Sequence, residues 1–295
     1  MLATSLSAAD YSWVKAKDDY GWGYTAYVLN LVAFHDRIWT FEGNVIHSSP
    51  NGRDWTIETR NPGWTGEVAQ GNVLVFHSKL WTLGGHSDDG KRLRNDVWSS
   101  EAGNNWQQVT ASAGWSPRRG HATVAFRGKM WVLGGDGLND VWSSPDGVRW
   151  TRVAEHAAWP ARNRHRLLVS NDSLWLISGL AGERQLCDVW SSTDGATWVE
   201  VTGCAQWGRR FAPSAVVYDG KLWVMGGFQK NDVWFSEDGH RWRRATDNAG
   251  WFPRGGTSLA ELNGKLWLLG GKTGISSNSN PQDIWYMTAA TRAAP

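Results

Sequence analysis

The chain has 295 residues, of which 41% are apolar and 34 are glycine, a composition typical of a turn-rich globular β protein. Its 30 Lys and Arg nearly balance its 28 Asp and Glu, and a net charge of +2 argues against nucleic-acid binding. The sequence has no run of about 18 apolar residues and no secretory pattern at its N-terminus, so we expect a cytoplasmic, monomeric protein without a membrane span.

The first predicted strand is residues 11–17, which stands before a series of repeated units. Pairs of tryptophans with eight residues between them mark this repeat, at Trp13/Trp22, Trp55/Trp64, Trp106/Trp115, Trp150/Trp159, Trp198/Trp207 and Trp242/Trp251. The spacing divides the chain into six units and a tail, at about 22–60, 64–111, 115–155, 159–203, 207–247, 251–287 and 288–295.

Each unit contains four predicted strands, named a to d, which are clearest in the third unit. An alternating run, HATVAF, precedes a tight turn and an apolar run, MWVLGG. A variable loop leads to NDVWSS, and a Pro-Asp-Gly turn leads to RWTRVA. Short β-branched, apolar and aromatic runs broken by Gly or Asp-Gly predict antiparallel strands joined by hairpins.

The sixth unit lacks a fourth strand, because the chain runs from Asp283-Ile284-Trp285 into the tail. The segment around Trp13 has the spacing of a d strand, so we expect it to complete the sixth unit and to remove the exposed sheet edges. The whole chain, 1–295, is therefore predicted to be one all-β domain, a six-bladed β-propeller of four-stranded antiparallel blades.

The 23 tryptophans are explained by the scaffold. Four positions per unit in six units give 24 slots, and Trp fills all but the c-strand slot of unit 1, where His47 stands. We interpret these rings as wedges between twisted sheets rather than as a stacking platform for a ligand.

The repeat resembles the Kelch motif, in which Gly-Gly follows an aromatic strand and a spaced Trp follows downstream, as in the central domain of galactose oxidase. The Gly pairs are Gly84/Gly85, Gly134/Gly135, Gly226/Gly227 and Gly270/Gly271, and the resemblance covers residues 11–287. Proteins similar to this motif include protein-binding adaptors, sialic acid mutarotases, nitrile-specifier proteins and copper radical oxidases. None of their functional motifs carries over onto these residues, so we expect no cofactor.

Positions counted back from the b-strand Trp compare the loops that enter each unit. Thirteen positions back, an arginine recurs as Arg118, Arg162, Arg210 and Arg254. Ten positions back, His121 and His165 match, and a histidine is usual there in Kelch motifs. We interpret both as scaffold residues. Half of a metal site is the weaker alternative, since a complete site needs three or four ligands.

Residues that differ between units are available for function. Guanidinium groups match carboxylates and phosphates, so the basic residues near units 3 to 5 predict a site for a small anionic molecule. The expected contacts to the anion are Arg119, Arg164, Arg166 and Arg210, and the expected orienting residues are Asn163, Gln70 and Phe211. An interpretation of equal weight is that these arginines are exposed at the rim and pair with neighbouring carboxylates.

Two further functions remain open. A metal-independent isomerase, lyase or cyclase acting on such an anion would use Glu42 or Glu67 as base and Tyr24 or Tyr27 as acid. A protein partner with an acidic segment is the third possibility. Cys187 and Cys204 should lie close together in a c–d hairpin, either as a vicinal thiol pair or, the interpretation we favour, as buried free cysteines.

Overall fold

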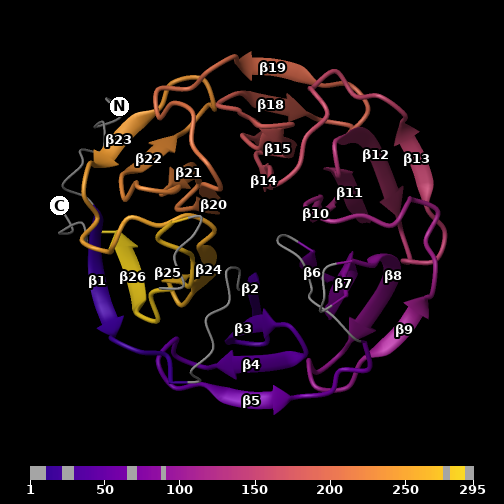
Figure 1. Cartoon of the computed structure of the whole chain (residues 1–295), viewed down its shortest axis with the longest axis horizontal. Coiled ribbons are helices and arrows are strands. Elements are labelled where there is room, and N and C mark those ends of the chain that lie inside the picture. Colours follow the sequence, from indigo (N-terminus) through magenta and orange to yellow (C-terminus); the bar gives the residue numbers. More distant parts are fainter. Residues whose placement is uncertain (1–10, 22–29, 65–71, 88–90, 275–279, 290–295) are drawn as a thin grey trace, which may run out of the picture.

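The computed structural model describes residues 11–21, 30–64, 72–87, 91–274 and 280–289. Six four-stranded antiparallel sheets surround a central axis, with each a strand innermost and each d strand outermost (Figure 1). This confirms the predicted six-bladed propeller. Within the described residues, no helix is long and apolar enough to span a membrane. Tyr24, Tyr27, Glu67 and Gln70 lie outside the described residues.

The blades follow the chain in order. Blade 1 consists of β2 (Asn30–Phe34), β3 (Arg37–Glu42), β4 (Val45–Ser49) and β5 (Thr56–Thr59). Blade 2 consists of β6 (Val73–Phe76), β7 (Lys79–His86), β8 (Leu93–Ser100) and β9 (Gln107–Thr110). Blade 3 consists of β10 (Ala122–Phe126), β11 (Lys129–Gly135), β12 (Leu138–Ser144) and β13 (Thr151–Ala154).

Blade 4 carries an extra hairpin in its b–c loop. Blade 4 consists of β14 (Arg166–Ser170), β15 (Ser173–Ile177), β18 (Val189–Ser192) and β19 (Val199–Thr202), with β16 (Leu180–Ala181) and β17 (Arg184–Gln185) as the extra hairpin. Blade 5 consists of β20 (Ser214–Tyr218), β21 (Lys221–Met225), β22 (Val233–Ser236) and β23 (Arg243–Thr246). Blade 6 consists of β24 (Ser258–Leu262), β25 (Lys265–Leu269), β26 (Ile284–Ala289) and β1 (Tyr11–Lys17).

The N-terminal strand closes the ring as predicted. β1 pairs antiparallel with β26, and Trp13 lies opposite Met287. The Trp13 ring packs edge-on against Trp251 with centroids 6.0 Å apart. The hydroxyl of Tyr11 also donates a hydrogen bond to Asp219 Oδ2 in blade 5, at 2.6 Å. The first described strand therefore ties blade 6 to its neighbour.

The b-strand tryptophans join each blade to the next. Trp131 Nε1 donates a hydrogen bond to the carbonyl of Phe126 in its own blade, at 2.9 Å. Its ring packs on the c–d turn of blade 4, where Gly195 has φ +76° and a Cβ would come within 2.2 Å of the indole. This turn therefore requires glycine for both its backbone conformation and its close approach to the ring. The predicted scaffold role of these rings and turns is confirmed.

The expectation of free cysteines is wrong. Cys187 and Cys204 form a disulfide, with Cα atoms 4.6 Å apart. The reason lies in the hairpin geometry: the carbonyl of Cys187 accepts a hydrogen bond from the N–H of Ala205, which brings the two side chains face to face.

Candidate functional site

The d–a and b–c loops meet at one end of the ring. Asn163 and Leu180 exchange two backbone hydrogen bonds of 2.9 Å in blade 4. In blade 5 the N–H of Phe228 donates to the carbonyl of Phe211, and in blade 3 the N–H of Asp136 donates to the carbonyl of Arg119. We call these loops of blades 3 to 6 the rim.

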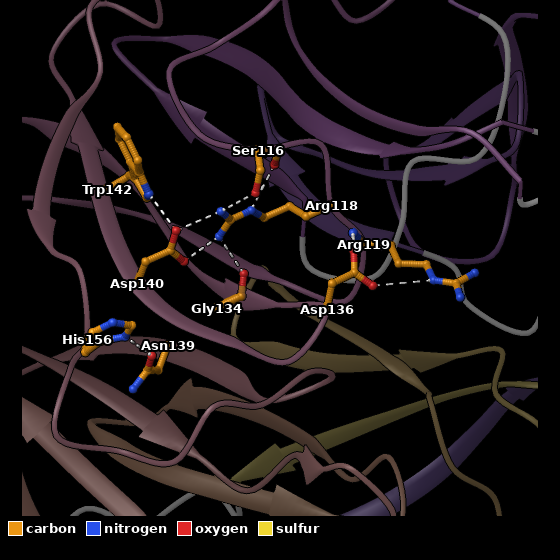
Figure 2. A network of polar contacts seen from close by, with 9 residues as sticks. All are labelled: Ser116, Arg118, Arg119, Gly134, Asp136, Asn139, Asp140, Trp142 and His156. Carbon is orange, nitrogen blue, oxygen red and sulfur yellow. Dashed lines mark hydrogen bonds and ion pairs between the residues drawn. The ribbon is translucent and has the colours of Figure 1, made fainter.

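A layer of buried ion pairs lies beneath the rim. Arg118 is 1% exposed, and its Nη1 and Nη2 donate to the two carboxylate oxygens of Asp140 at 2.6 and 2.8 Å (Figure 2). Asp140 Oδ2 also accepts a hydrogen bond from Trp142 Nε1 at 2.8 Å. The equivalent pairs are Arg162–Asp188, Arg210–Asp232 and Arg254–Asp283. We call these four pairs the clamp layer.

Two carboxylates of the clamp layer, Asp140 and Asp232, are held in the charged form. Burial alone would raise the pKa of Asp140, but the hydrogen bonds from Arg118 and Trp142 outweigh it, so the pKa is lowered. The Asp232 carboxyl shifts in the same direction for the same reasons. These arginines are therefore balanced by fixed counter-charges, which leaves them little role with an external anion.

Arg210 was expected to hold an anion, and the structure places it in the clamp layer instead. Its side chain is fully buried in the ion pair with Asp232, and Nη1 also donates to the carbonyl of Gly226 at 2.8 Å. It occupies the same repeat position as Arg118, Arg162 and Arg254, so the position itself identified it as scaffold.

Blades 1 and 2 depart from the clamp pattern. In blade 2, Asp96 still accepts from Trp98 Nε1, but its arginine is Arg94 on the same strand, with Nε 3.7 Å from Asp96 Oδ1. In blade 1 the c strand carries Val45 and His47 where other blades carry Asp and Trp. Burial, and next the charge of Arg60, lower the pKa of His47 to about 4.

The rim contains a left-handed backbone position eleven residues before the b-strand Trp of blades 3 to 6. It is occupied by Gly120, Arg164, Ala212 and Gly256, with φ of 66°, 55°, 51° and 72°. The N–H of Arg164 donates to the carbonyl of Gly120 at 2.7 Å, and the N–H of Gly256 donates to that of Ala212 at 2.8 Å. These bonds link one blade to the next. A left-handed conformation disfavours any residue with a Cβ, so Arg164 is held there against its own preference.

The side chain of Arg164 lies on an aromatic stack. Its Cζ is 5.2 Å from the ring centroid of Phe211 on the neighbouring blade. Phe211 stacks in turn on Phe228 with centroids 4.8 Å apart and an interplanar angle of 21°. A guanidinium over a ring is oriented by a cation–π contact, and its N–H groups remain in the plane of the group, where planar oxyanions bind.

Arg119 lies at the rim, one residue beyond a clamp arginine. Its side chain is 56% exposed, and its Nε lies 3.8 Å from Asp136 Oδ1. Asp136 Oδ2 accepts a hydrogen bond from the backbone N–H of Arg119 at 2.9 Å (Figure 2). The Asp136 carboxylate therefore holds the backbone of the loop more closely than it holds the Arg119 guanidinium. Of the other expected contacts, Arg166 is half-buried and its Nε donates to the carbonyl of Pro213 at 2.8 Å.

The two histidines are buried between blades. His121 is 1% exposed, and its Nε2 lies 3.0 Å from the carbonyl oxygen of Leu83 on the preceding blade. Burial and then Arg118 lower the pKa of His121 to about 3, and burial and then Arg162 lower that of His165 well below its usual value. No cluster of three or more potential metal-ligating side chains occurs among the described residues.

Glu42 lies away from the rim arginines. It ends β3 in blade 1, whereas Arg164 precedes β14 in blade 4, on the opposite side of the ring (Figure 1). Its side chain is buried, and burial followed by the Glu42 charge raises the pKa of Tyr20. The rim loops of blades 3 to 5 and the start of β14 thus carry Arg119, Asn163, Arg164, Arg166 and Phe211, whereas Glu42 ends β3 in blade 1.

Sequence reasoning missed Phe228 and the conformation of Arg164. Phe228 was hidden because it lies in a b–c loop of variable length, which gives no fixed spacing from a Trp. The left-handed position left a signal: glycine occupies it in blades 3 and 6, as Gly120 and Gly256.

Comparison with known proteins agrees with the fold. A profile of the KLHDC2/KLHL20/DRC7 Kelch-repeats domain matches residues 44–227. Among curated proteins, no match was found. The structure is similar to a solved structure titled "Structure of YjhT", with a TM-score of 0.72 and 16% sequence identity over 89% of this chain and 93% of that one. At this identity the likeness concerns the fold alone.

Proposed function

We propose that this chain, which belongs to the KLHDC2/KLHL20/DRC7 Kelch-repeats domain family, uses its propeller as a binding module for a small anionic molecule. The rim of blades 3 to 5 would hold the carboxylate or phosphate group of this molecule. Arg164 and Arg119 supply the positive charge, and Phe211 orients the first of them. Gln70 stays a prediction as a further orienting residue.

The observation that carries this proposal is Arg164 at a left-handed backbone position. A non-glycine residue in such a position costs on the order of 1 kcal/mol, and glycine occupies it in two other blades. Nothing in the repeat requires a long cationic side chain there. A binding role accounts for Arg164, because the Phe211 ring holds its guanidinium at the rim.

The neighbouring charges support the same role. The exposed ion pair between Arg119 and Asp136 is long, and such pairs contribute little, so Arg119 can turn to a ligand at small cost. The clamp arginines below are neutralised by their carboxylates. An anion at the rim would therefore interact mainly with Arg119 and Arg164.

A protein partner with an acidic segment is the second candidate, and one observation favours it. Phe252 in the d–a loop of blade 6 is 71% exposed, which is unusual for so large an apolar side chain. An enzyme is less well supported, because Glu42, one of its two candidate bases, ends β3 in blade 1, on the opposite side of the ring from blade 4, where Arg164 precedes β14 (Figure 1).

The test uses Arg164→Gly, which removes the side chain and suits the left-handed backbone. Its matched control is Ala212→Gly, which introduces glycine at the same repeat position one blade on. Sugar acids, sugar phosphates and dicarboxylates are screened by thermal shift, and those that respond are titrated calorimetrically. A charge-assisted contact is worth about 1.5 to 3 kcal/mol, so we expect about 10- to 100-fold weaker binding in Arg164→Gly only.

Equal binding by Arg164→Gly and the wild type would refute the role of Arg164. No response to any anion would refute the proposal for small molecules. In that case, binding of an acidic peptide that is weakened by Phe252→Ala would establish the second candidate.

A further inference from the structure

A pair of side chains recurs at the outer edge of the blades, 17 residues apart in the chain. The first member stands just before the c-strand Asp, and the second lies in the loop that leaves the d strand. Three of the pairs are hydrogen-bonded: Asn95–Ser112, Asn139–His156 and Asn231–Asn248. The Asn139–His156 pair lies apart from the clamp residues Arg118 and Asp140 (Figure 2). In blade 4 the same two positions carry Cys187 and Cys204, joined covalently.

The backbone register is the same in each case. The N–H of Ala113 donates to the carbonyl of Asn95 at 2.9 Å, and the N–H of Ala205 donates to that of Cys187 at 2.8 Å. The disulfide therefore replaces a hydrogen-bonded pair at an equivalent place in the fold. It does not reflect a local rearrangement of blade 4.

The asparagines do more than bind their partner, because they also hold the loop. Asn95 Nδ2 donates to the carbonyls of Ala113 and Trp115, at 3.0 and 2.9 Å, and Asn231 Nδ2 donates to that of Trp251 at 2.9 Å. A disulfide has no N–H to donate. In blade 4 the start of the following loop, residues 204–211, is therefore held to the c strand by the S–S bond and the single backbone bond from Ala205.

That loop leads directly to the proposed anion site. It contains Arg210 of the clamp layer and ends at Phe211, the ring on which Arg164 lies. Cys204 is exposed and Cys187 is 3% exposed, so a reductant reaches the bond from the Cys204 side. The chain has no other cysteine.

We propose that Cys187–Cys204 is a reversible thiol–disulfide site that controls the hold on residues 204–211. A dithiol reductant attacks Cys204 Sγ, the S–S bond breaks, and Cys187 leaves as a thiolate that takes up a proton. The second thiol of the reductant then displaces Cys204. The protein gains two electrons and two protons, and the reductant leaves as its own disulfide.

Reduction loosens the loop and displaces Phe211, so it weakens binding at Arg164. This last step rests on the proposed function, whereas the loosening of the loop does not. In the cytoplasm, where the sequence leads us to expect the chain, protein disulfides are mostly transient or redox-sensing, which suits a switch better than a permanent cross-link.

The experiment compares the wild type with Cys187→Asn/Cys204→Ser, which recreates the Asn95–Ser112 pair of blade 2. Both proteins are incubated with and without dithiothreitol, thiols are counted by alkylation and intact mass, and amide hydrogen exchange is followed in residues 204–211. We expect two thiols to appear in the wild type and exchange in this loop to rise about tenfold. The equivalent loop 112–119, held by Asn95, and the whole double variant should not respond.

The outcomes separate the two proposals. Two free thiols before reduction that a mild oxidant fails to join, or unchanged exchange in 204–211 after reduction, would overturn this inference whatever the anion screen gives. Faster exchange with unweakened anion binding would overturn the coupling to Arg164. Faster exchange in a protein that binds no anion would sustain the redox site and refute the proposed function.

Discussion

Arg118 and Arg119 are adjacent in the chain and have opposite surroundings. Arg118 is buried, meets both oxygens of Asp140 and recurs as Arg162, Arg210 and Arg254. Arg119 is more than half exposed and has only a long contact with Asp136. Two consecutive residues thus belong to different layers, Arg118 to the clamp layer and Arg119 to the rim. An arginine in this chain is assigned a role by its position in the repeat, because its residue type is the same in both layers.

Blade 1 sharpens this comparison, because it lacks the clamp altogether. It has Val45 and His47 at the positions of the c-strand Asp and Trp. The acid and its Trp partner are thus missing together. Removing one member of a buried ion pair leaves the other charge unpaired, whereas replacing both with apolar residues costs much less. The two blades that depart from the clamp pattern and the four with intact pairs are therefore not expected to tolerate the same substitutions.

The largest predicted effect follows from breaking one clamp. Arg162→Ala leaves the buried carboxylate of Asp188 without its counter-charge, so we expect the free energy of unfolding to fall by about 3 to 5 kcal/mol. Adding Asp188→Val, as in blade 1, removes that carboxylate and should recover part of the loss. Urea denaturation measures both variants. Arg149→Ala, at an exposed arginine, is the control and should change stability by less than about 0.5 kcal/mol.

A double variant less stable than Arg162→Ala would contradict this account. Such a result would mean that the hydrogen bond from Trp190 Nε1 to Asp188 outweighs the unpaired charge.

The fold followed from the sequence because a propeller repeats one pattern of tryptophans, glycines and turns, and each copy supports the interpretation of the others. The site followed only partly. Arg210 occupies the same repeat position as Arg118, so the repeat itself places Arg210 in the scaffold rather than at the anion. Phe228 and the stacking of Arg164 depend on side chains from two blades meeting across a loop of variable length. No spacing along the chain encodes such a contact.

The disulfide was missed for a different reason. The sequence predicts that Cys187 and Cys204 lie near each other, but buried free cysteines were the favoured interpretation. The 17-residue spacing shared with Asn95–Ser112 would have shown that this position pairs side chains in several blades.

An intermediate effect is expected from pH, through the buried histidine of the clamp region. The unfolded chain protonates His121 near its ordinary pKa of 6.5, whereas the folded protein keeps it neutral down to about 3. Stability from this group is therefore complete above pH 6.5 and is lost as the pH falls toward 3. At pH 5 the loss is about 2 kcal/mol relative to pH 7.

The measurement is urea denaturation at both pH values for the wild type and for His121→Thr, since blade 6 has Thr257 at this position. We compare the pH-dependent difference rather than the absolute stability, because the substitution also changes packing. His165→Thr should likewise reduce the loss of stability between pH 7 and pH 5, because the pKa of His165 is also lowered in the folded protein. A wild-type difference that persists undiminished in both variants would assign the pH dependence to other groups.

The smallest effect on stability is expected at the rim itself. Arg119→Ala removes an exposed side chain from a long ion pair, so the free energy of unfolding should change by no more than about 0.5 kcal/mol. Asp136→Ala removes the acceptor of the Arg119 N–H and should cost about 1 kcal/mol. Anion titration should order the two variants the other way, with the weaker binding in Arg119→Ala. If Arg119→Ala instead destabilised the protein as Arg162→Ala does, then Arg119 would belong to the scaffold, and the distinction between clamp and rim would fail.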